Sequence, residues 1–412
     1  MANVSSSNGL EKRPKLRFPG FDEPWEICKA ESLFRNITDK NHPDDTVLTI
    51  VQGKGTLPRD KSGRNIHYDD ASLSNYKRVE KGDFIIHLRS FEGGLEMAHE
   101  TGIVSPAYTI LRCSKPHSSL FYEAYFHTDE FINHVLSKAV EGIRDGRQIS
   151  YEAFKWLGIP YCTNAEQEKI SGLFDAINRR IEKQEQIVNA LKKYKRGLSD
   201  ELFSKNGATD DWTAIPFSEA FELLQNNTFS RDEMSTENGI VYNIHYGDVL
   251  IKYGAVVDLS KVEVPYIKSD VSLSKFAQHS YLKDGDIVIA DTAEDYTVGK
   301  AVEIAGITDE KALSGLHTIP CRPKLSFAPM YLGYFINSNR FRAQILPLIQ
   351  GTKVSSISKS EIMKTSVVFP SYEMQSRIAS MLYTMDLKID ICNACAQKLI
   401  RTKEALMQRL FI

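Results

Sequence analysis

Two long stretches of the chain, residues 166–203 and 374–411, share one spacing of hydrophobic positions. In each stretch these positions follow steps of four, three, four and seven residues. This is the heptad spacing of an amphipathic helix that packs along one stripe. Proline is absent from both stretches and glycine is sparse. The pattern predicts two helices, each roughly 55–60 Å long at the usual rise of about 1.5 Å per residue.

The two stretches align without a gap at an offset of 208 residues, and both end in Leu-Phe. The predicted stripe of the first helix is Ile170, Phe174, Ile177, Ile181, Val188, Leu191, Leu198 and Leu202. The matching positions of the second are Ile378, Leu382, Met385, Ile389, Ala396, Leu399, Leu406 and Leu410.

Amphipathic helices of this length need a packing partner. Each helix could pack on its neighbouring globular segment, or the two could pack on each other. Equal length, equal register and a continuous stripe favour the second arrangement. An antiparallel pair is expected, because a globular segment, residues 206–371, separates the two helices along the chain.

The segments between the helices are also repeated. In each half a tryptophan precedes a short strand and a helical turn, a Gly-Asp turn opens a hydrophobic strand, and a glycine with a basic residue precedes a short helix and a strand. The paired segments are 20–34 with 208–223, 81–90 with 284–293, and 142–160 with 348–370. Strand-like and helix-like runs mix in both halves, which is typical of α+β or mixed α/β domains.

The predicted fold is therefore α+β, with two similar mixed α/β domains, two long helices in an antiparallel coiled coil and a pseudo-twofold internal repeat. The predicted boundaries are a polar tail at 1–13, a first domain at 14–163, a first helix at 164–205, a second domain at 206–371 and a second helix at 372–412.

Composition agrees with this organisation. A chain of 412 residues is too long for one hydrophobic core of ordinary size, which indicates two domains or more. A content of 42% hydrophobic and 25% charged residues is typical of globular proteins. There is no run of about 18 apolar residues and no hydrophobic leader in the first residues, so we expect a cytoplasmic protein without a membrane segment. The net charge of −2 does not itself indicate a nucleic-acid binder, although local basic loops can bind DNA.

Motifs of catalysis are missing from the sequence. It contains no GxxxxGK[ST], G-x-S-x-G or H-E-x-x-H, and no Pro-Pro turn of an adenine methyltransferase. Cys392 and Cys395 have metal-like spacing, but no second ligand pair accompanies them, so no metal site is predicted. The scattered histidines and the acidic segments 42–45 and 291–295 are interpreted as surface or loop residues. Nothing here favours an enzyme.

The order of several short motifs resembles the specificity subunits of type I restriction-modification systems. "PKLRFPGFDEPWE" (14–26) resembles the start of the family's first target-recognition domain, and "GIVSPAYTILR" (102–112) and "HYGDVLIKYG" (245–254) resemble its internal strands. The helix start with Glu166, Gln167 and Ile170 resembles the family's spacer helices. In the second copy Met374 replaces the glutamate, while Gln375 remains.

This resemblance implies a non-catalytic subunit that carries no cofactor. Each recognition domain would read one half of a bipartite, asymmetric site in double-stranded DNA, and the helix pair would set the spacing. Two methyltransferase (modification) subunits would use S-adenosylmethionine, and restriction subunits, which are ATP-dependent translocases and nucleases, would use ATP and Mg.

Candidate DNA contacts are polar and basic residues in loops, because Arg, Lys, Asn and Gln read base edges and Lys, Arg, Ser and Thr bind phosphates. In the first half these are Lys54, Arg59, Lys61, Arg64, Asn65, Arg89, Arg147 and Gln148. In the second half they are Lys252, Tyr253, Thr292, Tyr296, Lys300, Thr352, Lys353 and Ser355.

Two alternatives stay open at this point. The chain could be a coiled-coil adapter that holds partners and reads no DNA, or an enzyme with an unrecognised motif. Two large and divergent domains argue against a pure adapter, and the missing cofactor motifs argue against an enzyme.

Overall fold

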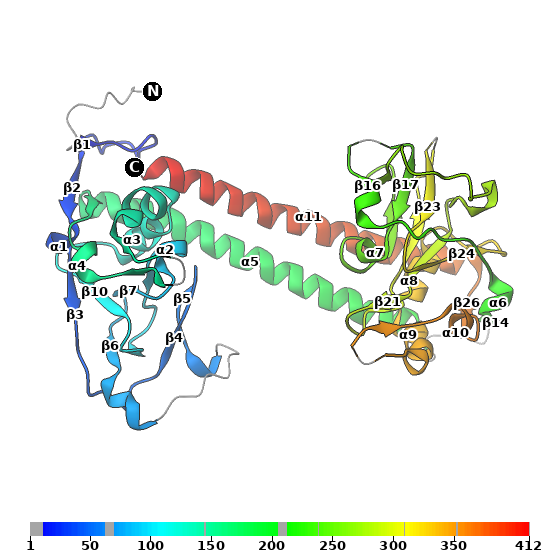
Figure 1. Ribbon diagram of the computed structural model, residues 1–412, viewed down its shortest axis with the longest axis horizontal. Helices are drawn as coiled ribbons and strands as arrows, with labels where there is room; N and C mark the ends of the chain where they lie inside the picture. The colour runs from blue at the N-terminus through cyan, green and yellow to red at the C-terminus, as the bar shows by residue number, and fades with distance from the viewer. Residues whose placement is uncertain are drawn as a thin grey trace. The chain divides into compact units, whose positions relative to one another are not determined.

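The protein folds into two compact units that divide both long helices (Figure 1). Unit 1 comprises residues 1–185 and 394–412, and unit 2 comprises residues 186–393. This computed structural model describes residues 11–61, 70–143, 146–204, 212–237, 239–308, 310–351 and 353–411. The predicted Arg64, Asn65 and Thr352 lie outside the described residues.

Unit 1 is built around a four-stranded sheet of order β3-β10-β7-β8, next to a three-stranded sheet of order β1-β2-β13. Its elements are β1 (Glu11–Lys12), β2 (Trp25–Lys29), α1 (Ala30–Leu33), β3 (Phe34–Ile37), β4 (Leu48–Val51), β5 (Gly55–Pro58), η1 (Arg59–Lys61), η2 (Asp70–Asn75), β6 (Lys77–Val79), β7 (Phe84–Ile86), α2 (Ser90–Gly93), β8 (Glu96–Met97), β9 (Gly102–Val104), β10 (Thr109–Cys113), α3 (Ser119–Phe126), η3 (Glu130–Val135), η4 (Leu136–Ala139), β11 (Val140–Glu141), β12 (Gln148–Ile149), α4 (Tyr151–Phe154), β13 (Gly158–Tyr161) and the first part of α5 (Asn164–Leu202).

Unit 2 is built around a five-stranded sheet of order β15-β24-β20-β22-β18, with a second sheet of order β16-β19-β17-β23. Its elements are β14 (Thr213–Pro216), α6 (Phe217–Ala220), β15 (Phe221–Leu223), η6 (Arg231–Glu233), β16 (Met234–Ser235), β17 (Val241–Ile244), α7 (Tyr246–Ile251), β18 (Val256–Asp258), β19 (Tyr266–Ile267), η7 (Gln278–Ser280), β20 (Ile287–Ala290), β21 (Thr292–Ala293), β22 (Ala301–Ala305), β23 (Lys311–Ser314), β24 (Thr318–Pro323), α8 (Tyr331–Ile336), α9 (Asn339–Ile345), η8 (Leu346–Leu348), β25 (Ser355–Ser356), α10 (Lys359–Ile362), β26 (Ser366–Phe369) and the first part of α11 (Tyr372–Leu410).

The internal repeat predicted from the sequence is present in the sheet register. In unit 1 the central strand β7 pairs antiparallel with β10 and with β8, and Phe84 lies opposite Leu111. In unit 2 the central strand β20 pairs in the same way with β24 and β22, and Ile287 lies opposite Cys321. Phe84 and Ile287 occupy the same place in the repeated sequence. The α+β fold with two similar halves is thus confirmed.

A buried aspartate explains why the Gly-Asp turn is repeated. The Asp83 side chain closes its turn by accepting a hydrogen bond from the Glu80 amide at 2.8 Å. The same carboxylate forms a bidentate ion pair with Arg112. In unit 2, Asp286 and Arg322 form the same pair at 2.7 and 3.0 Å. A buried carboxylate needs such a partner, so the turn and the neighbouring strand are kept together in both halves.

A buried glutamine fixes the start of each long helix. The side chain of Gln167 accepts the Ser118 amide at 3.0 Å and donates to the Cys162 carbonyl at 2.9 Å. Gln375 makes the same two bonds, to the Ala328 amide and the Pro370 carbonyl, at the same distances. The repeated glutamine therefore ties each helix to the domain that precedes it.

Within unit 1, the first turns of α5 pack against the last turns of α11. The Phe174 ring stacks on the Phe411 ring with 5.9 Å between centroids, and Phe411 also contacts Trp25 and Phe121 in the core. Because low residue numbers of one helix meet high numbers of the other, the pair is antiparallel.

Within unit 2, the last turns of α5 pack near the first half of α11. Lys195 forms an ion pair with Asp386, whose other oxygen accepts the Tyr334 hydroxyl at 2.7 Å. Phe203, at the end of α5, lies in the core against Tyr331. The prediction that the two helices pack on each other is confirmed, and the alternative holds as well, since each helix also packs on a domain core.

The predicted stripe residues all lie at buried or half-buried positions, as the heptad spacing requires. The Leu-Phe that ends each helix has the same role twice, because Phe203 and Phe411 are both buried. No helix among the described residues has both the length and the apolar character needed to cross a membrane.

Candidate nucleic-acid interface

The segment after the central strand of each sheet carries one of the predicted DNA-contact residues. In unit 1 this segment carries Arg89 and α2, and in unit 2 it carries β21 with Thr292. Arg89 and Thr292 occupy matching places in the repeat. The same place in the fold is thus occupied by different side chains in the two halves.

In unit 1, α2 lies beside β12, which carries the predicted residue Gln148. The guanidinium of Arg147 stacks over the Phe91 ring at 4.3 Å from its centroid. Arg89 is largely exposed and pairs with Glu92 at 3.0 Å. Arg89 thus faces solvent around one short helix together with Arg147 and Gln148, which follow it 58 and 59 residues later in the sequence. We call Arg89, Phe91, Arg147 and Gln148 the first cluster.

The turn between β4 and β5 adds Lys54 close to the first cluster. Lys54 is exposed at the tip of the turn, and the neighbouring Gln52 side chain lies against Gly93 at the end of α2. The turn is anchored from beneath by the fully buried Glu96. Its carboxylate accepts the amides of Gly53 and Gly55 at 2.6 and 2.8 Å. The glycines on both sides of Lys54 are thereby fixed.

His127 completes this anchor. Its Nε2 lies 3.3 Å from Glu96 and its Nδ1 lies 2.8 Å from the Glu123 carbonyl, so both ring nitrogens face acceptors. Only the imidazolium form can donate from both. Burial disfavours the charged forms of both His127 and Glu96, but the attraction between the imidazolium and the carboxylate outweighs this effect. The pKa of His127 is therefore raised, and the pKa of Glu96 is lowered with help from the glycine amides.

Arg59 and Lys61 follow the same hairpin in η1. Arg59 is half-buried, with its guanidinium 6.0 Å from the Tyr76 ring centroid, whereas Lys61 is exposed. Lys61 is therefore available at the surface.

In unit 2, β21 and β25 pair antiparallel, with Thr292 opposite Ser356 and Ala293 opposite Ser355. This pairing brings together Thr292 and Ser355, two predicted residues that are distant in the sequence. Lys353, before β25, is exposed. The turn at Gly142 in unit 1 and the turn at Gly351 in unit 2 have the same backbone requirement. Both glycines have a positive φ, and a Cβ at either position would collide with a backbone carbonyl.

Tyr253 and Lys300 are engaged inside unit 2. Tyr253 is buried, which raises the pKa of its phenol. The Lys300 amine donates to the carbonyls of Leu250 and Tyr253 at 2.9 and 2.8 Å, and burial lowers its pKa. Tyr296, in contrast, is 79% exposed.

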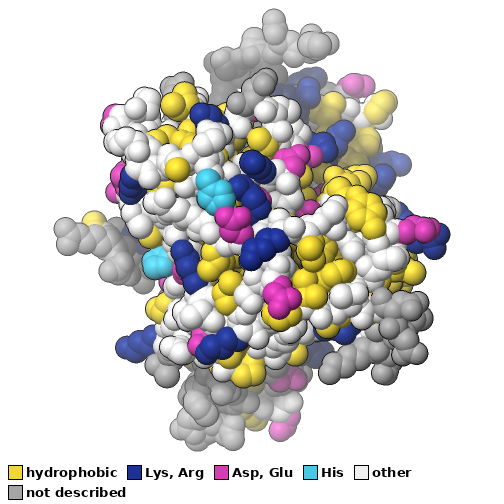
Figure 2. Space-filling view, turned by 90° about the vertical axis from the view of Figure 1, so that its right-hand side faces the viewer, with side chains coloured by type: hydrophobic (Ala, Val, Ile, Leu, Met, Phe, Trp, Pro, Cys, Tyr) yellow, Lys and Arg dark blue, Asp and Glu magenta, His cyan; other side chains and the backbone are white. Residues whose placement is uncertain are grey.

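Basic and acidic side chains alternate over the surface of the molecule shown in Figure 2. On the displayed face Lys and Arg are interspersed with Asp, Glu and hydrophobic side chains. The mixture of charges on this face agrees with the net charge of −2.

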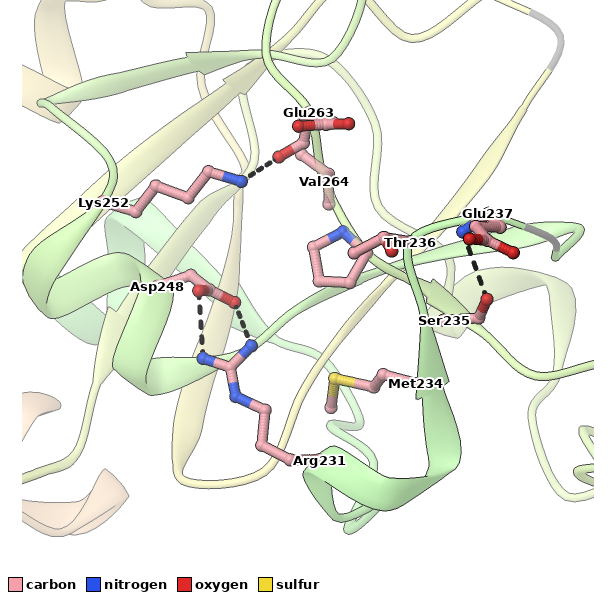
Figure 3. Close-up of a pocket in the computed structure, with 10 residues that line it drawn as sticks. Arg231, Met234, Ser235, Thr236, Glu237, Asp248, Lys252, Glu263 and Val264 are labelled. Atoms are coloured by element: carbon pink, nitrogen blue, oxygen red, sulfur yellow. Dashed lines mark hydrogen bonds and ion pairs between the residues drawn. The ribbon is translucent and has the colours of Figure 1, made fainter. Parts of the chain in front are cut away.

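An open cavity of about 450 Å³ in unit 2 contains the predicted residue Lys252 (Figure 3). Its amine donates to the Glu263 carbonyl, and Arg231 forms a two-pronged ion pair with Asp248 at 2.8 and 2.9 Å. Glu237 also lines the cavity. Lys252 and Arg231 both bond to other groups of unit 2, and acidic side chains lie beside them, so the wall of the cavity has mixed charge.

Two solved structures match the chain over nearly its whole length. The S subunit of the type I restriction-modification system of M. genitalium aligns with a TM-score of 0.54 at 13% identity, covering 97% of this chain and 99% of that one. A chain from work on complex assembly and conformational transition of the type I R-M system aligns with a TM-score of 0.56 at 14% identity, covering 96% and 99%. The chain has the fold of a type I restriction-modification specificity subunit. No protein-family model matches the sequence.

Within this specificity-subunit fold, sequence reasoning missed several side chains beside Thr292. Asp291 and His317 contact Thr292, and the Tyr246 ring lies 5.3 Å from the His317 ring. We call Tyr246, Asp291, Thr292, His317 and Ser356 the second cluster. A lone histidine and an acidic turn carry no pattern in a sequence, and only the sheet pairing places them together. The described residues contain no group of three His, Cys, Asp or Glu side chains placed to hold a metal ion.

Proposed function

We propose that the chain is the non-catalytic DNA-specificity subunit of a type I restriction-modification complex. Each unit reads one half of a bipartite, asymmetric DNA site. The observation that carries this proposal is the repeat itself. The same framework occurs twice, with the same sheet register and the same helix anchor, yet it presents different side chains at matching places.

This combination suits a reader of two different half-sites. Matching helices suit two copies of one partner, because identical partners need matching surfaces. Divergent surface residues suit two different base sequences. Tandem halves related by a pseudo-twofold axis can each meet the duplex in the same way, since DNA has local dyads.

The first cluster supplies groups that can read bases directly. Arg89 and Arg147 can bond the O6 and N7 atoms of guanine, and Gln148 can bond adenine through N6 and N7. Lys54 and Lys61 lie at the neighbouring hairpin and suit phosphate contacts, which position a protein without reading sequence. In unit 2, Thr292, Tyr296, Lys353 and Ser355 take the corresponding roles.

The helix pair docks two modification subunits and sets the unread spacer between the half-sites. S-adenosylmethionine belongs to those modification subunits, and ATP and Mg belong to restriction subunits that join the complex. The chain contributes sequence recognition and carries no cofactor of its own.

A selection from random DNA tests this proposal. The complex of this chain with its host's modification subunit is mixed with random double-stranded DNA, and the retained fragments are sequenced. We expect two short sequence blocks at a constant separation. Retained DNA with no common sequence, despite an intact complex, would indicate an adapter that does not read DNA.

A further inference from the structure

His317 is an exposed histidine held in an uncommon backbone conformation. Its φ of 53° lies in the left-handed region, which costs a residue other than glycine roughly 1 kcal/mol or more. The residue follows β23 and comes directly before β24, and its carbonyl accepts the Asp291 amide at 3.1 Å. The conformation brings the His317 ring to the start of β21, beside the pairing with β25.

The ring of His317 is oriented from one edge. Nδ1 lies 3.4 Å from the Asp291 carboxylate and 3.4 Å from the Thr292 hydroxyl, which in turn donates to Asp291 at 2.7 Å. Tyr246 approaches the ring nearly perpendicularly, at 77°. Asp291 is itself fixed, because its carbonyl accepts the Ile357 amide at 2.8 Å.

The contacts at Nδ1 determine whether Nε2, on the opposite edge of the His317 ring, accepts or donates a hydrogen bond. An Nδ1–H facing a carboxylate leaves Nε2 of the neutral ring as an acceptor. No hydrogen bond to Nε2 occurs within the part of the chain that the structure describes, and the side chain is 48% exposed. An acceptor at this edge complements an exocyclic amino group, which adenine and cytosine present in the major groove.

Unit 1 has a different surface at the same place. When the register of the two sheets is continued beyond the last paired residues, Leu88 and Ala107 correspond to Asp291 and His317. Leu88 is exposed and apolar, so this half offers no comparable acceptor there. An acceptor in one unit and an apolar group in the other is what two halves with different half-sites require.

We propose that His317 is a specificity-determining residue of unit 2, whose Nε2 accepts a hydrogen bond from the amino group of one adenine or cytosine. Asp291 and Thr292 are positioning residues that hold the ring and its tautomer. This inference rests on the proposed function and assigns one base position of one half-site to one side chain.

The test is the random-DNA selection repeated with the His317→Asn and His317→Gly variants in the intact complex. Both replacements tolerate positive φ, so the backbone turn is retained. We expect one position in the half-site of unit 2 to lose roughly fivefold to tenfold of its selectivity, as the loss of one base contact implies. The half-site of unit 1 stays unchanged. Asp291→Ala weakens selectivity at the same position without changing any other.

His279→Asn is the matched control. His279 is also an exposed histidine of unit 2, but it pairs with Glu222 at 2.7 Å, away from the second cluster. Its replacement leaves both half-sites intact. If the wild-type complex selects a bipartite site and both His317 variants select the identical site, the inference about His317 is wrong while the proposed function stands. If the wild-type complex selects no site, the proposed function itself fails.

Discussion

The contact between Glu96 and His127 links the structure of the turn that carries Lys54 to the protonation state of His127. The two hydrogen bonds of His127 together need the imidazolium, since both ring nitrogens face acceptors. Other titratable groups nearby are Glu123, His99 and His87. Because the folded pKa of His127 is raised, its contribution to stability is fully present below the ordinary value of about 6.5 and is lost as the pH rises through the raised pKa.

Hydrogen exchange at the Gly53 and Gly55 amides measures this coupling. After correction for intrinsic exchange, we expect both amides to lose protection as the pH rises through the folded pKa of His127. In His127→Gln the protection should be lower at acidic pH and should no longer change across this range. Equal pH profiles for the wild-type and variant chains would contradict the role assigned to His127.

Gln167 and Gln375 give a second prediction at the residue scale. Replacing either one with leucine removes two hydrogen bonds and leaves a buried carbonyl and a backbone amide, buried in unit 2 and half-buried in unit 1, without their partner. We expect each change to lower the free energy of unfolding of its own unit by about 2–3 kcal/mol. The exposed Gln397 is the control, and Gln397→Leu should change it by less than about 0.5 kcal/mol in denaturant titrations.

At the scale of elements, the long helices were the most predictable part of the molecule. A stripe that runs from Ile170 to Leu202, and again from Ile378 to Leu410, is a strong periodic signal, and the structure has a helix of 39 residues at each place. The short strands around the candidate site were harder to place. β21 and β25 have two residues each, and their pairing joins segments more than 60 residues apart.

The proposed spacing role of the helices gives a prediction for the helix pair. Inserting one heptad into α5 and one at the facing level of α11 keeps the stripe in register and lengthens the pair by about 10 Å. We expect the unread spacer in the selected DNA to grow by roughly three base pairs, with both half-sites unchanged. A selected site with its original spacer would show that the helices do not set the distance.

In the candidate site, too, residue type could be judged from the sequence, whereas contacts between distant residues could not. Residue type and loop position predicted Arg89, Arg147, Gln148, Thr292 and Ser355 as DNA contacts, which stays a prediction. The fold places Gln148 beside the helix that follows Arg89, and it places Ser355 beside Thr292. Residue type alone could not show that the Lys300 amine donates hydrogen bonds to backbone carbonyls, because the direction of a side chain depends on tertiary packing. Nor could it reveal the contact between Asp291 and His317, which exists only because β20 and β24 are neighbours.

At the scale of the whole molecule, the two units should act as separable readers. Each has its own core, its own sheet and its own helix anchor. Replacing residues 206–370 with the corresponding segment of another specificity subunit should change one half of the selected site and leave the other half intact. Changes in both halves would show that the units do not read DNA independently.

The most direct test of the central claim is adenine methylation across the genome of the host. Sequencing that reports N6-methyladenine is carried out with the intact gene, with the gene deleted, and with the deletion complemented. The account predicts a methylated motif of two separated parts that is lost on deletion and restored on complementation. A motif that persists in the deletion strain, or a complemented strain with active modification subunits and no bipartite methylated motif, would contradict it.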